Sequence, residues 1–118
     1  MQKLISWVEI PATNFDRAVK FYNFVFKLNL QKEDFGQEKM ACFPNGEGAI
    51  SYAPNFKPSE NGVMVSFTAL DTIEATIQRI ESNGGKTLQP KTKIEVEGRD
   101  YFAICTDSED NKIGIYGK

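Results

Sequence analysis

The apolar residues in the first half of the chain change period along the sequence. Residues 4–10 (LISWVEI) are rich in β-branched and aromatic side chains and are followed by Pro11, which predicts a strand. Beyond Pro11 the apolar residues recur at spacings of three and four, the period of an amphipathic helix. This helical stripe consists of Phe15, Ala18, Val19, Tyr22, Val25 and Phe26.

Short apolar segments and turn signals follow the predicted helix. The pairs Phe35-Gly36 and Asn45-Gly46 are typical of turns. They separate three predicted strands, at about 31–35, 38–43 and 49–53. The polar stretch 54–62, which contains two prolines, is the clearest linker in the chain.

The second half repeats the same order of elements. A strand is predicted over 63–69, and the helix after it has apolar Ile73, Ile77 and Ile80 and ends at Asn83-Gly84-Gly85. Three further strands are predicted near 86–88, 101–106 and 112–116. As N-caps of the two helices we predict Thr13 and Asp71, with the acidic residues Asp16 and Glu74 three positions further on.

The two halves align at a spacing of 58 residues, which carries Trp7 onto Val65 and Phe15 onto Ile73. The match is one of pattern and not of residues. It predicts a single α+β domain over 1–118, built from two βαβββ modules at about 1–55 and 61–118. In each module a helix would cover one face of a small sheet and leave the other face to line a cavity.

Composition excludes several classes of function. The chain has 14 basic and 16 acidic residues, so it lacks the basic excess of a nucleic-acid-binding protein. It has no apolar stretch of about 20 residues and no signal-like start, so we predict a cytoplasmic location and no membrane partner. The absence of histidine excludes Ser-His-Asp and Cys-His catalysis and any metal site that needs imidazole.

Four segments carry a resemblance to a known family. The first two are 9–18 (EIPATNFDRA) and the helical pairs Phe21-Tyr22 and Val25-Phe26, and the others are 83–86 (NGGK) and 107–114 (DSEDNKIG). In this order they resemble the vicinal oxygen chelate superfamily, the glyoxalase/bleomycin resistance/dioxygenase group, over essentially the whole chain. The chain departs from the family pattern at Lys27, where a glycine is usual, and within the last segment at Ser108, Asp110 and Gly114.

The resemblance implies a divalent metal held by the first and last strands of each module. The four ligand positions fall on Trp7, near Ser51, on Val65 and on Gly114, none of which is a good ligand for such an ion. We therefore predict a member that lacks the metal site and has no cofactor. Glyoxalase I and dioxygenase activities are not expected, and the description "lactoylglutathione lyase-related" is not supported at these positions.

Because side chains alternate along a strand, one set of residues is predicted to line the cavity. Glu9 is the candidate catalytic residue, since a carboxylate desolvated in an apolar strand would serve as a general acid or base. The alternative is a solvated Glu9, or one paired with Arg99 or a lysine. Trp7 would either stack on a planar ligand or fill the vacated metal site. The predicted ligand-binding set is Ile5, Trp7, Ser51, Val63, Val65, Phe67, Lys112 and Tyr116.

Three functions are compatible with these features. The favoured one is a metal-independent protein that encloses a small, partly apolar or aromatic ligand. The first alternative is a metal-independent lyase or isomerase with Glu9 as general base, and the second is a degenerate member with a filled cavity and an interaction role only. In each case a homodimer with two equivalent cavities is expected.

Overall fold

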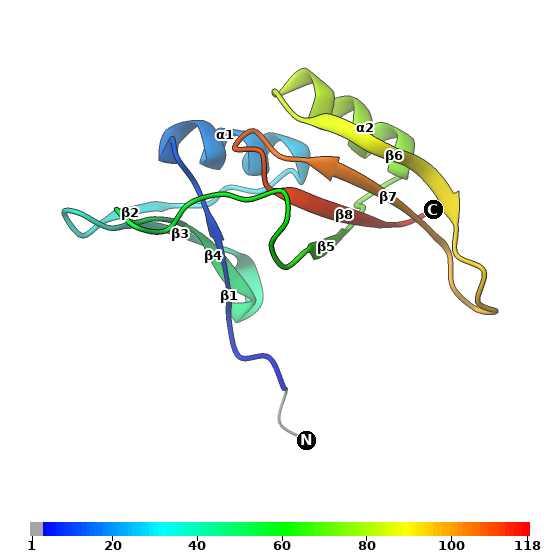
Figure 1. Cartoon of the computed structure of the whole chain (residues 1–118), viewed down its shortest axis with the longest axis horizontal. Helices are drawn as coiled ribbons and strands as arrows, with labels where there is room; N and C mark the ends of the chain where they lie inside the picture. The colour runs from blue at the N-terminus through cyan, green and yellow to red at the C-terminus, as the bar shows by residue number, and fades with distance from the viewer. Residues whose placement is uncertain (1–3) are drawn as a thin grey trace.

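The computed structural model describes residues 4–118, and these form two sheets and two helices (Figure 1). The first half contains one strand, one helix and three strands, and the second half repeats this order, which confirms the α+β fold of twin βαβββ modules. The elements are β1 Val8–Pro11, α1 Phe15–Val25, β2 Lys32–Asp34, β3 Lys39–Cys42, β4 Gly48–Tyr52, β5 Val65–Thr68, α2 Ile73–Ser82, β6 Lys86–Lys93, β7 Tyr101–Thr106 and β8 Lys112–Gly117.

The two sheets have the same topology. Their strand orders are β1-β4-β3-β2 and β5-β8-β7-β6, with the first pair of each sheet parallel and the others antiparallel. Both helices lie above the sheets in Figure 1, so each sheet has one helix-covered face and one open face below it. We call these the helix face and the open face.

Both predicted helix caps are wrong by one residue. The side chain of Asn14, not Thr13, accepts a hydrogen bond from Arg17 N at 3.0 Å. Likewise Thr72, not Asp71, caps α2 by accepting from Ala75 N at 3.1 Å. The capping residue must directly precede the first helical residue for its side chain to reach the free N–H groups.

The strand-to-helix connection is one residue longer in the second module. Ala12 N donates to Ser51 O and Ala69 N donates to Tyr116 O, both at 2.9 Å, so these alanines are structurally equivalent. They lie 57 residues apart, whereas the helices begin 58 apart. A shift of one residue turns every side chain of a strand over to the other face.

This extra residue reverses the predicted faces of β5. Val65 pairs with Ile113, whose side chain is buried on the helix face, and Ser66 pairs with Gly114 on the open face. The expectation that Val65 and Phe67 share a face with Lys112 and Gly114 is therefore wrong. In the first module the predicted alternation is confirmed at Ile10, which is buried on the helix face.

An aromatic cluster joins the two modules beneath the helices. The Tyr22 and Phe26 rings of the first module lie 5.6 and 4.9 Å from the Phe67 ring, between centroids, and Phe43 lies 5.9 Å from it. Phe67 was predicted to face the same cavity as Lys112 and Gly114, but it lies on the helix face, partly buried against the core between the modules.

The turn between β7 and β8, residues 107–111, binds the beginning of α1. The Glu109 carboxylate accepts hydrogen bonds from Thr13 N at 3.0 Å, Asn14 N at 2.7 Å and Arg17 Nε at 2.7 Å. It thus satisfies two free N–H groups at the positive end of the helix dipole. Asn111 Nδ2 donates to Pro11 O at 2.8 Å and fixes the end of β1.

Asp107 anchors the same turn to the core. Its carboxylate accepts from the Tyr22 hydroxyl at 2.6 Å and from the backbone N–H groups of Glu109 and Asn111. Burial raises the pKa of Asp107, and burial also holds the pKa of Tyr22 well above its usual value. The two modules are therefore linked by a fully hydrogen-bonded polar network next to the aromatic cluster.

Glu109→Gln tests the contribution of this turn to stability. Burial alone would raise the pKa of Glu109, but hydrogen bonds from Arg17, Asn14 and Ser108 outweigh it and lower the pKa. The ionised carboxylate therefore stabilises the fold above its unfolded pKa of 4.5, and this contribution is lost as the pH falls through the lower folded value. We expect the variant to lose about 2 kcal/mol of unfolding free energy at pH 7 and the difference to shrink below about pH 4.5, measured by urea denaturation.

Glu97→Gln is the matched control, because Glu97 is exposed in the loop between β6 and β7. It should unfold like the parent chain at every pH. A Glu109→Gln deficit that is the same at acid and neutral pH would contradict the assigned role of the ionised carboxylate.

Candidate functional site

A polar pair occupies the open face of the first sheet. Ser51 Oγ donates a hydrogen bond to Glu9 Oε1 at 2.8 Å. The pair forms because β1 and β4 are parallel, with Glu9 opposite Ala49 and Pro11 opposite Ser51, so the two side chains project from the same face. Ser51 is buried and Glu9 is exposed. The expected desolvation of Glu9 is therefore wrong, and the solvated alternative describes it, which leaves the carboxylate accessible to a ligand.

Glu9 and Ser51 line a cavity of about 340 Å³. The walls come from Met40 on β3, Phe35 in the β2–β3 turn and Phe56 in the linker. Two carboxylates, Glu9 and Glu38, and the ammonium group of Lys39 also line it. The cavity therefore combines apolar and aromatic walls with a few charged groups, which is common in small-molecule sites. Within residues 4–118 Glu9 forms no salt bridge, and the predicted alternative partner Arg99 lies over the Tyr116 ring instead, at 5.7 Å.

The segment before β1 is exposed. The strand predicted from Leu4 begins only at Val8, so Ile5 and Trp7 precede it with exposed fractions of 64% and 41%. Neither the 340 Å³ cavity nor the 390 Å³ cavity described below includes Trp7. Trp7 is thus a partly exposed side chain ahead of β1.

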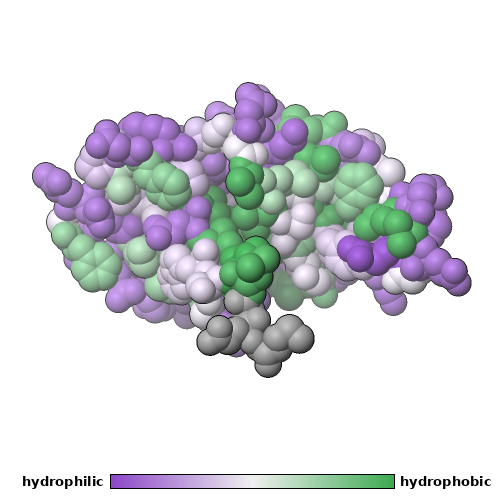
Figure 2. All heavy atoms as spheres, turned by 60° about the horizontal axis from the view of Figure 1, so that its bottom comes forward, coloured by the Kyte–Doolittle hydropathy of each residue, from purple (hydrophilic) through white to green (hydrophobic). Residues whose placement is uncertain are grey.

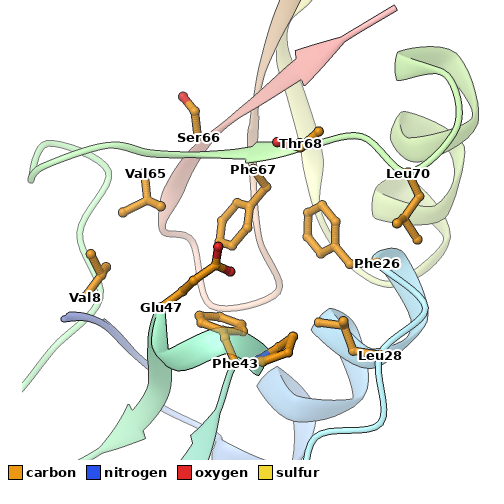
Figure 3. Close-up of a pocket in the computed structure, with 11 residues that line it drawn as sticks. Val8, Phe26, Leu28, Phe43, Glu47, Val65, Ser66, Phe67, Thr68 and Leu70 are labelled. Carbon is orange, nitrogen blue, oxygen red and sulfur yellow. The ribbon is translucent and has the colours of Figure 1, made fainter. Parts of the chain in front are cut away.

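The remaining predicted residues lie in three different places. Lys112 and Tyr116 are on the open face of the second sheet, with Gly114 between them. Val63 precedes β5 and is 95% exposed. Val65 and Phe67 line a cavity of about 390 Å³ between the modules (Figure 3).

Phe35, Met40 and Phe56 are cavity residues that the sequence interpretation did not identify. Met40 has a usable signal, since the hairpin places it directly opposite Ser51 and so on the same face. Phe35 and Phe56 lie in a turn and in the linker, where no periodicity indicates which way a side chain points.

The ligand positions of a divalent metal are occupied by residues that do not fit one. In the second module the expected pair at these positions was Val65 and Gly114. In the observed register Ser66, not Val65, lies opposite Gly114 on the open face. A Cβ added at Gly114 would collide with Ser66 Oγ, so a longer acidic side chain there requires Ser66 to move. Among residues 4–118 there is no group of three or more acidic or cysteine side chains that could hold a metal ion.

Apolar side chains are exposed where each module begins. Figure 2 shows apolar side chains in the middle of the side that carries the open faces. The exposed apolar residues ahead of β1 and β5 are Leu4, Ile5, Trp7, Val63 and Met64. Contiguous exposed apolar surface is typical of interaction sites.

The chain is an α+β protein built from two βαβββ modules, with both helices on one side and the open sheet faces on the other. The sequence profile of the Glyoxalase/Bleomycin resistance protein/Dioxygenase superfamily matches residues 4–115, and the chain belongs to this superfamily.

Individual relatives agree with this assignment. The chain is 33% identical over 122 residues to a glyoxylase-like domain-containing protein of Didymella fabae, covering 86% of the chain and 92% of the relative. Its fold is similar to a glyoxalase/bleomycin resistance protein from Albidiferax ferrireducens, with a TM-score of 0.70, 20% identity, and coverage of 98% and 99%. It is also similar to a fosfomycin resistance protein from Listeria monocytogenes, with a TM-score of 0.68, 13% identity, and coverage of 100% and 93%.

None of the helices within residues 4–118 has the length and apolar character needed to cross a membrane.

Gly114→Ala tests the register of the second open face. Because the added methyl group collides with Ser66 Oγ and lies 3.2 Å from Ser66 Cβ, we expect a loss of about 1–2 kcal/mol of unfolding free energy, measured by urea denaturation. In a Ser66→Gly background the same change should cost much less, as a double-mutant cycle will show. Gly62→Ala is the control, because its Cβ would meet only ordinary contacts at 3.8 Å. Equal costs for Gly114→Ala in both backgrounds would show that Ser66 does not face Gly114.

Proposed function

We propose that this chain is a small-molecule-binding protein of the glyoxalase/bleomycin resistance type that takes a partly apolar or aromatic ligand on its open sheet face without a metal ion. The observation that carries the proposal is the Glu9–Ser51 pair in a 340 Å³ cavity walled by Phe35, Met40 and Phe56. A volume of this size accommodates a compact organic molecule.

The walls and the carboxylate have separate roles in this proposal. Burial of ligand carbon against Phe35, Phe56 and Met40 supplies most of the affinity. The Ser51 hydroxyl holds one oxygen of Glu9 and so orients the carboxylate, whose other oxygen accepts a hydrogen bond from a hydroxyl, amide or ammonium group of the ligand. The preferred ligand is therefore an apolar body with one hydrogen-bond donor.

Metal independence is supported by the chemistry of the side chains. Ser51, Gly114 and Ser66 provide at most neutral hydroxyl groups. The carboxylates that line the cavity are those of Glu9 and Glu38, and Lys39 places a positive charge at the same cavity. Hard divalent cations require several oxygen ligands, among which carboxylates dominate. Binding on this face accordingly depends on apolar contact and on Glu9.

A second copy of the chain is the partner that we propose for the exposed apolar residues. The exposed residues Leu4, Ile5, Trp7, Val63 and Met64 precede β1 and β5, and a homodimer would cover them and enclose the ligand. A cytoplasmic location remains a prediction from the sequence.

A metal-independent lyase or isomerase is the second candidate function. It is favoured by the same pair, because a carboxylate oriented by a buried serine and open to a cavity is suitably placed to take a proton from a bound molecule. The third alternative, a filled cavity, is disfavoured because the cavity beside Glu9 is open in this structure.

Glu9→Gln separates binding from catalysis. In a ligand screen followed by amide chemical shifts, we expect hits that carry a hydrogen-bond donor to perturb Met40 and Ser51 and to bind about tenfold more weakly to the variant. Glu60→Gln, an exposed change in the linker, should leave their affinities unaltered. Turnover of a hit by the parent chain, abolished in Glu9→Gln while binding persists, would favour the enzyme.

The same titrations repeated in EDTA test metal independence, and the expected affinities are unchanged. Loss of binding in EDTA, or a stoichiometric divalent ion in the purified protein, would contradict the proposal. So would a screen in which no hit perturbs the amides that surround the Glu9 cavity.

A further inference from the structure

A second cavity, of about 390 Å³, lies between the two modules and is lined by residues of β1 and β5. It shares no lining residue with the cavity beside Glu9. Val8 of the first module and Val65 of the second face each other across it (Figure 3). It is therefore a separate site, created by the way the modules pack.

Aromatic rings form most of one wall of this inter-module cavity. Phe26 from the end of α1, Phe43 from the segment after β3 and Phe67 from β5 all project into it in Figure 3. The Phe67 centroid lies 4.9 Å from that of Phe26 and 5.9 Å from that of Phe43. The negative face of an aromatic ring attracts a cation as well as apolar surface.

Glu47 is the one charged side chain that lines the inter-module cavity among the residues described. Its carboxylate points into the cavity toward Phe67 in Figure 3. Across residues 4–118 no side-chain hydrogen bond or salt bridge engages it, whereas the carboxylates of Asp71, Asp107 and Glu109 are paired with basic groups or backbone N–H groups. The carboxylate is thus free to pair with a cationic group of a ligand.

The position of Glu47 is set by its neighbours in the chain. Gly48 follows it, and a Cβ at Gly48 would collide with the Val8 carbonyl oxygen, so only glycine lets β4 begin this close to β1. The Pro44–Gly46 turn precedes it. Glu47 is therefore held beside Val8 at the edge of the cavity by a tight turn and a close strand pairing.

The inter-module cavity is accessible from solvent. Phe43, Val65 and Phe67 are only partly buried, and Leu70 at its rim is 60% exposed. Its volume is within the range of small-molecule pockets. Such a site differs from a sealed packing void, whose lining is fully buried.

We propose that the inter-module cavity binds a small molecule with an aromatic body and one cationic group, such as an arylalkyl ammonium compound. The aromatic body packs on Phe26, Phe43 and Phe67, and the cation pairs with Glu47. An anionic molecule of the same shape is rejected by Glu47 and by the ring faces. The site is independent of Glu9 and extends the proposed function to a second class of ligand.

Three probes of matched shape test this proposal: 2-phenylethylammonium, 2-phenylethanol and phenylacetate. In amide chemical-shift titrations we expect the ammonium probe to perturb Phe43, Glu47, Val65 and Phe67 with a dissociation constant of about 1 mM. The alcohol should bind more weakly and the carboxylate not measurably. Glu47→Gln should weaken the ammonium probe about threefold to tenfold and bring it close to the alcohol.

Controls separate this site from the one beside Glu9. Glu97→Gln removes an exposed carboxylate elsewhere, and Glu9→Gln alters the open-face site. Both should leave unchanged the dissociation constant of the ammonium probe that is read from the amides of Glu47 and Phe67. Val65→Phe fills the inter-module cavity and should remove the binding of the ammonium and the alcohol probes there. The proposal is overturned if phenylacetate binds as well as the ammonium probe, if Glu47→Gln has no effect, if no probe binds, or if the perturbed amides surround Glu9 instead.

Discussion

The interaction on which the rest of the structure depends is the binding of the 107–111 turn to the start of α1. One buried carboxylate, that of Glu109, accepts hydrogen bonds from Thr13 N, Asn14 N and Arg17, and Asn111 binds Pro11 O. A turn of the second module thereby fixes the end of β1 in the first. Glu9 lies two residues before Pro11, so the candidate ligand residue is positioned by a contact that crosses between the modules.

Secondary structure was largely predictable because each element has a clear period or a clear turn signal. The stripe at Phe15, Ala18 and Tyr22 is helical, and the observed α1 has that stripe buried. The offset between equivalent strand residues of the two modules could not be predicted from period or turn signals. One additional residue between β5 and α2 leaves the 58-residue repeat of the helices intact but reverses the faces of Val65 and Phe67.

The same distinction applies to the candidate site: residues in regular strands were predictable from the sequence, and residues in turns or between modules were not. Glu9 and Ser51 could be placed on one face from the sequence because both lie in regular, paired strands. The walls at Phe35 and Phe56, the exposed position of Trp7 and the inter-module cavity depend on turns and on packing between modules, for which local sequence carries no periodic signal. The hairpin at 107–111 was recognised as a family resemblance, but its role in binding α1 became apparent only from the long-range hydrogen bonds.

These hydrogen bonds make the two modules one cooperative unit, and amide hydrogen exchange measures whether the modules open together. The slowest amides of β4 and of β8 report the opening of the first and second modules separately. We expect the two strands to have equal opening free energies and the amides of Thr13 and Asn14 to be protected. When Glu109 is replaced by Gln, the opening free energies of both strands should decrease by the same amount. Exchange in which β4 opens independently of β8, or in which Thr13 and Asn14 are unprotected, would contradict it.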